Sequence, residues 1–375
     1  MAKLGFIEWL ALGRVIASGS LIRTDDGARE CVRFESELAR WAGVDHALAV
    51  SSGTAGLVCA LQACGIGPGD EVLVPAYTWM GSAGAVLLAG AVPVLVEVDE
   101  TLTIDPEDMR AKITPHTRAV MPVHMINRPC DMDSILTIAR THGLRVIEDA
   151  CQAIGVRYRG QLCGTMGDVG VFSFNSYKNM TSGEGGAVLT RDPQIMERMT
   201  NAHDLGISYR GQTLGNSPVF LGANYRISEL QGAILRVQLR KLPKTLRRMR
   251  RRTEIIAKAL RAAGHPLTPA NDPAAPLSVA LTFETEEEAK AFSQRPGARR
   301  LFDNSKHVYT EWRPILDRRM AHPRVDPWAW AEIAPDRVID DCPRTLDLLR
   351  RTCAVNLKMR APEPVAKVLA RQLAT

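Results

Sequence analysis

The chain has 375 residues, of which 46% are hydrophobic and 23% are charged, which is enough to bury a large core in one or two domains. Its formal net charge of +6 is mild for this length, so it does not indicate a nucleic-acid-binding protein, although it suits an anionic ligand. The eight cysteines form no CxxC pair and do not combine with histidines at zinc spacing. We therefore expect no metal and no disulfide framework, and a reducing compartment.

The N-terminal segment is apolar enough to raise the question of a signal peptide, but Glu8 and Arg14 interrupt it. No uncharged stretch of membrane-spanning length occurs in the sequence. We expect a soluble, cytoplasmic protein with neither a membrane nor a nucleic acid among its partners.

Short apolar runs alternate with longer helical patterns from about residue 46 to residue 205. The pattern predicts strands over residues 46–52, 71–79, 92–98, 119–125, 145–149, 169–174 and 187–190. It predicts helices over residues 53–67, 81–91, 105–113 and 132–143. This alternation indicates an α/β fold, with a mostly parallel sheet covered by helices on both faces. In such sheets, ligands bind at the carboxyl ends of the strands.

Beyond residue 225 the pattern changes to a long amphipathic helix, followed by a loop over residues 268–276 and a strand within residues 277–285. We therefore expect a large domain over residues 1–245, including the N-terminal segment, and a small C-terminal α+β domain over residues 246–375. Five arginines occupy six positions from Arg247 to Arg252. A solvated helix face explains them better than a nucleic-acid site, because no interleaved aromatic residues accompany them.

Two features at the ends of predicted strands suit a bound anion and a flat ring. In SSGTAG, residues 51–56, the free backbone N–H groups of a helix N-terminus form an anion site that Gly53 lets the anion approach closely. Such turns are common, so this one indicates little alone. Trp79 follows another strand, where an aromatic side chain is more often a core or rim residue than a platform for stacking.

Two further strand ends carry ionisable groups. Asp149 follows residues 145–148, where a carboxylate usually caps a helix or forms an ion pair, but can also hold a pyridine nitrogen protonated. Ser173 and Lys178 precede a glycine-rich turn. A serine hydroxyl can bind a phosphate oxygen, and a lysine with a lowered pKa can form a Schiff base with an aldehyde. The alternative for Lys178 is a solvated loop lysine. Together the four features describe a pyridoxal phosphate site.

Five motifs occur in the order typical of the DegT/DnrJ/StrS aminotransferases, which the sequence resembles over roughly residues 10–245. The motifs are SSGTAG (51–56), VLVPAYTW (72–79), EDACQA (148–153), FSFNSYKN with TSGEGG (172–186) and NYRISELQGAI (224–234). The resemblance implies a fold-type I, pyridoxal phosphate-dependent enzyme with Lys178 and Asp149 as catalytic residues: Lys178 as the Schiff-base lysine and Asp149 paired with the ring nitrogen. Some members of this family are dehydratases with histidine at that lysine position, so Lys178 favours transamination.

The same resemblance assigns the remaining cofactor contacts. Gln152 lies over the cofactor face, Trp79 stacks on the ring, and Asn224 reaches the phosphate of the neighbouring subunit's cofactor. This implies a homodimer with composite active sites. The residues expected to bind the cofactor are Gly53, Thr54, Trp79, Asp149, Gln152, Ser173, Lys178 and Asn224.

The donor and the acceptor are less defined by the sequence. Donors in the family are usually glutamate or glutamine, and Arg226 can bind a substrate carboxylate, although a surface arginine is an equal alternative. His124 and Tyr77 are candidates for the substrate pocket, with a satisfied core residue as the alternative for each. The acceptor implied by the family is a keto or aldehydo sugar, or a cyclitol, in lipopolysaccharide or secondary-metabolite biosynthesis.

The sequence resembles one branch of this family in two stretches, SGSLIR (18–23) and residues 224–242. That branch aminates the terminal aldehyde of an oxidised 3-deoxy-octulosonate sugar. The sequence of residues 301–327 differs from that expected of ordinary sugar aminotransferases. This difference leaves open the alternative that the protein is a pyridoxal phosphate enzyme of another reaction type, such as elimination, substitution or carbon–carbon bond formation. A non-catalytic regulator on the same fold is a further alternative, supported only by the arginine run.

Overall fold

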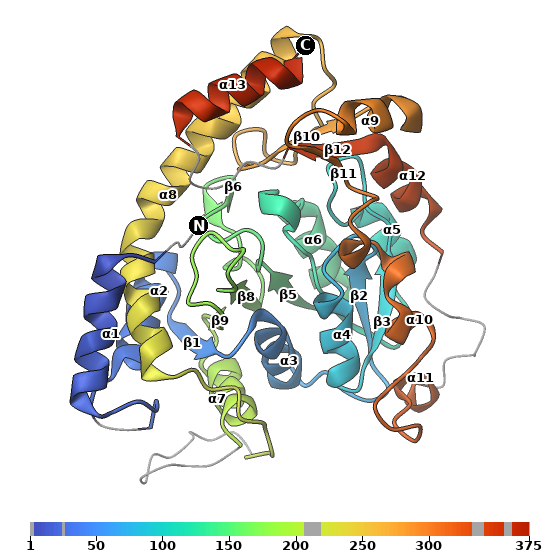
Figure 1. The fold of residues 1–375 in the computed structure, drawn as a ribbon. Coiled ribbons are helices and arrows are strands. Elements are labelled where there is room, and N and C mark those ends of the chain that lie inside the picture. Colours follow the sequence, from blue (N-terminus) through green and yellow to red (C-terminus); the bar gives the residue numbers. More distant parts are fainter. Residues whose placement is uncertain (1–3, 25–26, 206–218, 332–340, 356–361, 375) are drawn as a thin grey trace.

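A seven-stranded sheet forms the centre of the molecule, as Figure 1 shows for the computed structural model, which describes residues 4–24, 27–205, 219–331, 341–355 and 362–374. In spatial order its strands are β1 (His46–Val50), β9 (Gly186–Thr190), β8 (Val169–Ser173), β5 (Arg145–Asp149), β4 (Thr117–Val120), β2 (Glu71–Pro75) and β3 (Val92–Val96). Only β9 runs against its neighbours, and the other pairs are parallel. The expected mostly parallel sheet is confirmed.

Helices cover both faces of this sheet, which explains why its strands read as continuous apolar runs. The helices packed around it are α2 (Glu30–Ala42), α3 (Gly53–Ala63), α4 (Gly81–Leu88), α5 (Pro106–Ala111), α6 (Met132–His142), α7 (Pro193–His203) and α8 (Glu229–Ala262). Along β2, Val72 and Val74 pack with α3 and α4, whereas Leu73 packs with α5 and α6 on the opposite face. Successive strand residues thus enter separate cores.

The starts of these helices follow from short polar caps in the sequence. The Ser52 hydroxyl accepts a hydrogen bond from the Ala55 N–H at 3.0 Å and begins α3 directly after β1. Asp105 and Asp131 cap α5 and α6 in the same way. Because the cap of α3 directly follows β1, the side chains at the end of that strand lie close to a helix N-terminus.

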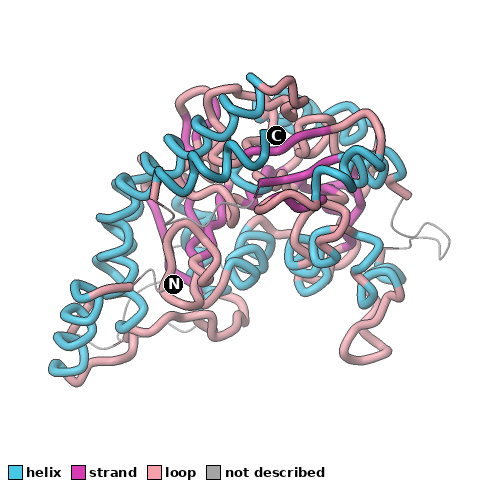
Figure 2. The backbone as a smooth tube through the Cα atoms, turned by 45° about the horizontal axis from the view of Figure 1, so that its top comes forward, coloured by secondary structure: helices cyan, strands magenta, loops and turns pink. Residues whose placement is uncertain are grey.

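A small three-stranded antiparallel sheet lies beyond α8. Its order is β10 (Val279–Thr282), β12 (Thr352–Val355) and β11 (Ala298–Arg300), and the helices near it are α9 (Glu286–Ser293), α12 (Pro343–Arg351) and α13 (Glu363–Ala374). In Figure 2 this sheet lies toward one end of the molecule, with the C-terminus nearby. The predicted domain boundary after residue 245 falls within α8, which runs unbroken between the two sheets. The division itself stays a prediction.

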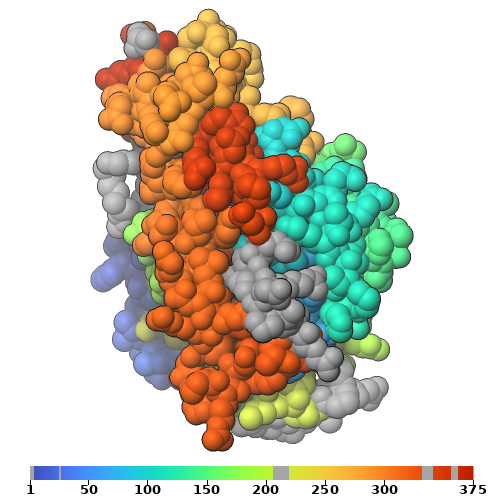
Figure 3. Space-filling model, turned by 90° about the vertical axis from the view of Figure 1, so that its right-hand side faces the viewer, coloured from blue at the N-terminus to red at the C-terminus, as the bar shows by residue number. Residues whose placement is uncertain are grey.

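The segment between β11 and α12 returns to the large domain. It contains two short 3-10 helices, η3 (Ser305–His307) and η4 (Tyr309–Glu311), and the short helices α10 (Arg313–Leu316) and α11 (Pro327–Trp330). Trp312 and Trp328 are buried in the same core as α3 and α4. Figure 3 shows this segment, in orange, running along one side of the molecule. Sequence position alone therefore does not assign these residues to the small domain.

An N-terminal helix, α1 (Phe6–Ser18), packs against α8 through Ala11 and Val15. A two-stranded ribbon of β6 (Arg157–Tyr158) and β7 (Gln161–Leu162) and a 3-10 turn, η1 (Met125–Asn127), complete the elements of the described residues. Within those residues, no helix combines the length and the apolar character that a bilayer crossing requires.

Candidate active site

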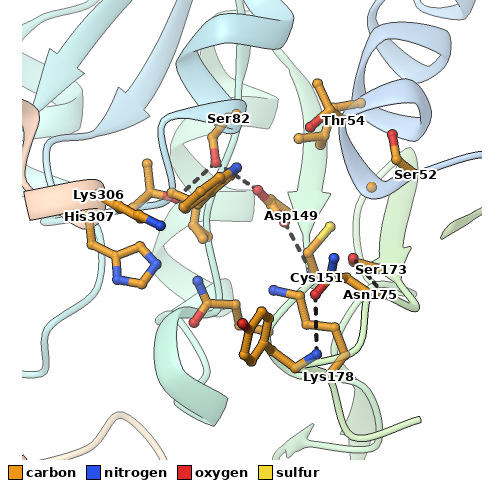
Figure 4. Close-up of a pocket in the computed structure, with 18 of the residues that line it drawn as sticks. Ser52, Thr54, Ser82, Asp149, Cys151, Ser173, Asn175, Lys178, Lys306 and His307 are labelled. Atoms are coloured by element: carbon orange, nitrogen blue, oxygen red, sulfur yellow. Dashed lines mark hydrogen bonds between the residues drawn. The ribbon is translucent and has the colours of Figure 1, made fainter. Parts of the chain in front are cut away.

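A cavity of about 670 Å³ opens at the carboxyl ends of β1, β5 and β8 (Figure 4). All the predicted cofactor-binding residues except Asn224 line it: Gly53, Thr54, Trp79, Asp149, Gln152, Ser173 and Lys178. These residues are spread over more than a hundred positions of the sequence. The parallel sheet brings them together because its strands end at one edge.

The first turn of α3 forms one side of the cavity. Gly53 begins the helix, so its N–H is among those that have no partner within the helix. A Cβ atom at Gly53 would lie 2.7 Å from Cys151 Sγ and 3.0 Å from Ser173 Cβ, closer than side chains pack. Glycine at this position therefore keeps the backbone open to the cavity beside the Ser173 hydroxyl, as an anion site requires.

Asp149 is the last residue of β5 and is buried with only 4% of its surface exposed. Ser82 donates a hydrogen bond from Oγ to Asp149 Oδ2 at 2.7 Å, and the Cys151 N–H donates to Oδ1 at 3.1 Å. The Ser82 and Thr78 hydroxyls are also 2.8 Å apart. The carboxylate is thus held in one orientation at the strand end while it still faces the cavity.

Lys178 lies in the loop that joins β8 to β9, as the sequence predicts. Its N–H donates to the Asn175 carbonyl at 2.9 Å, and the Phe174 N–H donates to the Gly185 carbonyl at 2.8 Å, which closes the base of the loop. At the start of β9, a Cβ atom on Gly186 would lie 2.6 Å from the Ser52 carbonyl oxygen. The glycines thus let this loop pack against the start of α3, with Lys178 on the cavity.

The cavity also holds a cysteine and an aromatic side chain near these groups. Burial, with the Asp149 carboxylate beside it, raises the pKa of the Cys151 thiol well above its ordinary value. Cys151 is therefore a protonated thiol that contributes shape rather than nucleophilic character. Trp79 lines the cavity with 44% of its surface exposed, and Gln152 lines it beside Asn127.

These residues fit pyridoxal phosphate. The α3 N-terminus and Ser173 offer donors for the phosphate, Asp149 offers a carboxylate for the ring nitrogen, and Lys178 offers an amine for the aldehyde. Gly53 leaves the space that the phosphate needs. When bound, this cofactor would act as an electron sink for an amino acid's α-carbon.

Two predicted substrate residues lie outside the cavity lining. His124 is fully buried, its Nε2 is 2.9 Å from Glu148 Oε2, and its Nδ1 accepts from the Cys130 N–H at 3.1 Å. Tyr77 is also buried and packs in a separate core with Val308. These contacts match the alternative of a satisfied core residue for His124, whereas the buried Tyr77 hydroxyl has no hydrogen-bond partner among the described residues. A substrate role for either residue stays a prediction.

Two residues of the motif before α8 also lie away from this cavity. The Arg226 guanidinium is ion-paired with the Asp204 carboxylate, and the two are bonded directly. Asn224 is exposed and pairs by its backbone with Asp204. A role for Asn224 in a neighbouring subunit's site, and for Arg226 with a substrate, stays a prediction.

The sequence reasoning missed one whole side of the cavity. This side, here called the C-terminal wall, comes from β11, η3 and the turn between them, and consists of Arg299, Asn304, Lys306 and His307. The Thr78 N–H donates to the His307 carbonyl at 3.2 Å, and Tyr77 forms an isolated bridge with Val308. The sequence signal for this wall was the unusual sequence of residues 301–327, which includes three of its four residues.

Ser82, Cys151 and Asn175 were missed as well, although Cys151 and Asn175 lie within two of the motifs and Ser82 lies three residues after a third. The signal that could have found Ser82 is its place in the first turn of the helix after Trp79. Its contact with Asp149 depends on two strands that are far apart in the sequence.

The model of the DegT/DnrJ/EryC1/StrS aminotransferase family matches residues 11–298. The chain belongs to this family. The resemblance drawn from the motifs is therefore confirmed, and so is pyridoxal phosphate as the cofactor of the family.

Individual relatives agree with this assignment. The GDP-perosamine synthase of Caulobacter vibrioides is 44% identical over 223 residues, a match that spans 58% of this chain and 58% of that enzyme. The crystal structure of 3-amino-5-hydroxybenzoic acid synthase superposes with a TM-score of 0.80 at 29% identity, covering 99% of this chain and 96% of that one. DesV of S. venezuelae gives 0.77 at 31% identity, with 98% and 93% covered. The predicted fold-type I architecture is confirmed.

Proposed function

We propose that the protein is a pyridoxal phosphate-dependent aminotransferase that moves an amino group from an amino acid to the carbonyl group of a sugar or cyclitol. The observation that carries this proposal is the convergence of Lys178, Asp149 and the Gly53–Ser173 anion site on one cavity. The family of the chain supports it. Glutamate or glutamine is the proposed donor.

Three side chains of the site have different roles in the proposed reaction. Asp149, kept in place by Ser82, would hold a protonated nitrogen with its carboxylate. Lys178 would carry a proton through its amine between two carbon atoms that face it in turn. Trp79, on the cavity surface, would cover a flat ring by stacking.

We also propose that two copies of the chain form a homodimer. Asn224 is exposed and lies away from the cavity of its own chain, which supports the expectation that it serves the neighbouring site. Helix α1 exposes large apolar side chains, with Phe6 at 70%, Trp9 at 65% and Ile16 at 64%. An apolar face of this kind suits burial between two copies.

A reducing cytoplasm is the proposed location. All eight cysteines are free thiols in the structure. This agrees with proteins that work in a reducing compartment.

A single-turnover experiment tests the proposed reaction. The protein is loaded with pyridoxal phosphate, freed of excess cofactor and mixed with glutamate or glutamine without any acceptor. The proposal predicts a change in the absorbance of the bound cofactor and one equivalent of 2-oxo acid per loaded site. Bound cofactor that neither donor changes would contradict it and would favour elimination or carbon–carbon bond formation instead.

A further inference from the structure

The C-terminal wall carries positive charge that the proposed cofactor site does not use. Arg299 lies on β11, and Lys306 and His307 lie on η3. Figure 4 shows Lys306 and His307 on the other side of the cavity from Ser52, Thr54 and Ser173. The wall is therefore separate from the place expected for the phosphate of the cofactor, and its charges remain to be explained.

The carboxylates of the cavity are engaged elsewhere. Asp149 accepts from Ser82, and Glu184 accepts a hydrogen bond from Asn175 Nδ2 at 2.8 Å. Among the residues that the structure describes, neither Arg299 nor Lys306 takes part in an ion pair. The charge of this wall thus faces the cavity without a carboxylate of the described chain to balance it.

The neighbouring residue on β11 gives a useful contrast. Arg300 is ion-paired with Glu286 and Asp303, and its guanidinium is largely buried. Adjacent residues of a strand point to opposite faces. Arg300 therefore supports the small domain, whereas Arg299 lines the cavity. Within the described residues, the Arg299 side chain donates a hydrogen bond only to the Asp303 carbonyl oxygen, at 3.1 Å.

The pKa of His307 reflects the positive charge near this wall. Burial, followed by the charges of Lys178, Arg299 and Lys306, lowers the pKa of His307 to about 4. Its Nδ1 contacts the Asn304 amide nitrogen, and its ring stands edge-on to Trp79 with centroids 5.9 Å apart. A place where three cations disfavour another positive charge is one where they favour a negative charge. The neutral imidazole can donate an N–H there.

We propose that Arg299, Lys306 and His307 bind an ionised group of the substrate, a carboxylate or a phosphate, on the side of the cavity opposite the cofactor phosphate. This inference rests on the proposed function and deepens it: the compound that faces Lys178 is an anion. A donor carboxylate and an anionic group of the sugar share this chemistry, and the experiment below separates the two.

Calorimetric titration of the cofactor-loaded enzyme tests the proposal. The probes are 2-oxoglutarate for the donor side, gluconate and GDP for carboxylate- and phosphate-bearing acceptors, and uncharged sorbitol as the reference. We expect Lys306→Gln and Arg299→Gln each to weaken binding of at least one anion by about tenfold or more, because a charge-assisted contact is lost. Lys306→Arg should restore most of the affinity.

Lys290→Gln is the matched control, because Lys290 is half-exposed on α9 and, among the residues that the structure describes, forms an ion pair only with Glu286. An effect on 2-oxoglutarate alone assigns the wall to the donor, and an effect on gluconate or GDP assigns it to the acceptor. Absence of anion binding to the wild-type enzyme, or equal affinities in Lys306→Gln, Arg299→Gln and Lys290→Gln, would overturn the proposal. The proposed function would stand in either case if glutamate or glutamine still yielded one equivalent of 2-oxo acid.

Discussion

The two sides of the cavity are built in different ways. Gly53, Asp149, Ser173 and Lys178, here called the strand-end wall, follow buried strands of the large sheet, and Asp149 and Ser173 are only 4% and 7% exposed. The C-terminal wall comes from a three-residue strand and a 3-10 turn, and its Arg299 and Lys306 are exposed. Reaction chemistry needs fixed geometry, whereas recognition of a particular substrate tolerates change. We therefore expect substitutions in the two walls to have separable effects.

Lys178→Ala should have the largest effect. The variant should fold but lose the absorbance of lysine-linked cofactor, and its transamination rate should fall by about 10³-fold or more, because no other group of the strand-end wall replaces the amine as proton carrier. Circular dichroism and the half-reaction with glutamate or glutamine measure these properties. An active Lys178→Ala enzyme would refute the assignment of the strand-end wall.

Asp149→Asn should come next, with a rate lowered by about 10²-fold. The amide keeps the shape of the side chain but cannot hold a positive charge at a ring nitrogen. The bound cofactor should still be linked to Lys178, which its absorbance would show. Wild-type rates in this variant would instead favour a purely structural role for Asp149 at the end of β5.

Most of the strand-end wall can be predicted from sequence, and the reason is local. Gly53, Asp149 and Ser173 each follow or end an apolar run of about five residues, so the strand pattern places them at one edge without knowledge of packing. The same rule also selected His124 and Tyr77, which are buried and do not line the cavity, although the Tyr77 ring lies 6.4 Å from that of the lining residue His307. The rule gives the edge of the sheet but not the direction in which a side chain points.

The C-terminal wall could not be predicted in this way. Its position depends on the packing of Trp312 and Trp328 against the core of α3 and α4, and on a single bridge between Tyr77 and Val308. These contacts join residues more than two hundred positions apart, and β11 is too short to carry an apolar pattern. The unusual sequence of residues 301–327 indicated that this region differs from its relatives, but it did not indicate that the region lines the cavity.

Gly53→Ala tests the steric part of the strand-end wall. Its new Cβ would meet Cys151 Sγ at 2.7 Å, so we expect the affinity for pyridoxal phosphate to fall by about tenfold. Adding Cys151→Ala should restore part of the affinity, since the sulfur is removed and Ser173 Cβ remains. Equilibrium titration of the cofactor into the apoprotein gives both values, and an unchanged affinity in Gly53→Ala would count against the phosphate site.

Ser82→Ala should have a smaller effect, because Ser82 only positions the carboxylate of Asp149. We expect a rate reduction of about three- to tenfold from the loss of one hydrogen bond to a charged group. The reduction should appear in the turnover rate rather than in the Michaelis constant, and Ser82→Thr should recover part of it. A change confined to the Michaelis constant would indicate a substrate contact instead.

The smallest effect concerns stability at low pH and the C-terminal wall. The pKa of His307 is about 4 in the folded chain, below its ordinary value of 6.5, so the unfolded chain binds more protons at this site between these values. The contribution of His307 to stability is therefore full above about pH 6.5 and decreases as the pH falls. His307→Asn should reduce the fall in Tm between pH 7.5 and pH 5 by about 1–3 °C. His116→Asn, at an exposed histidine, is the control and should show the fall in Tm of the wild type. Equal falls in Tm in His307→Asn and His116→Asn would contradict the prediction.

The separation of the two walls is tested most directly by titrating pyridoxal phosphate into the apoproteins of the wild type, Gly53→Ala and Lys306→Gln in parallel. The account predicts that Gly53→Ala loses about tenfold in cofactor affinity, whereas Lys306→Gln binds the cofactor as the wild type does. Equal losses in both variants would contradict it, because the C-terminal wall would then belong to the cofactor site rather than to the substrate.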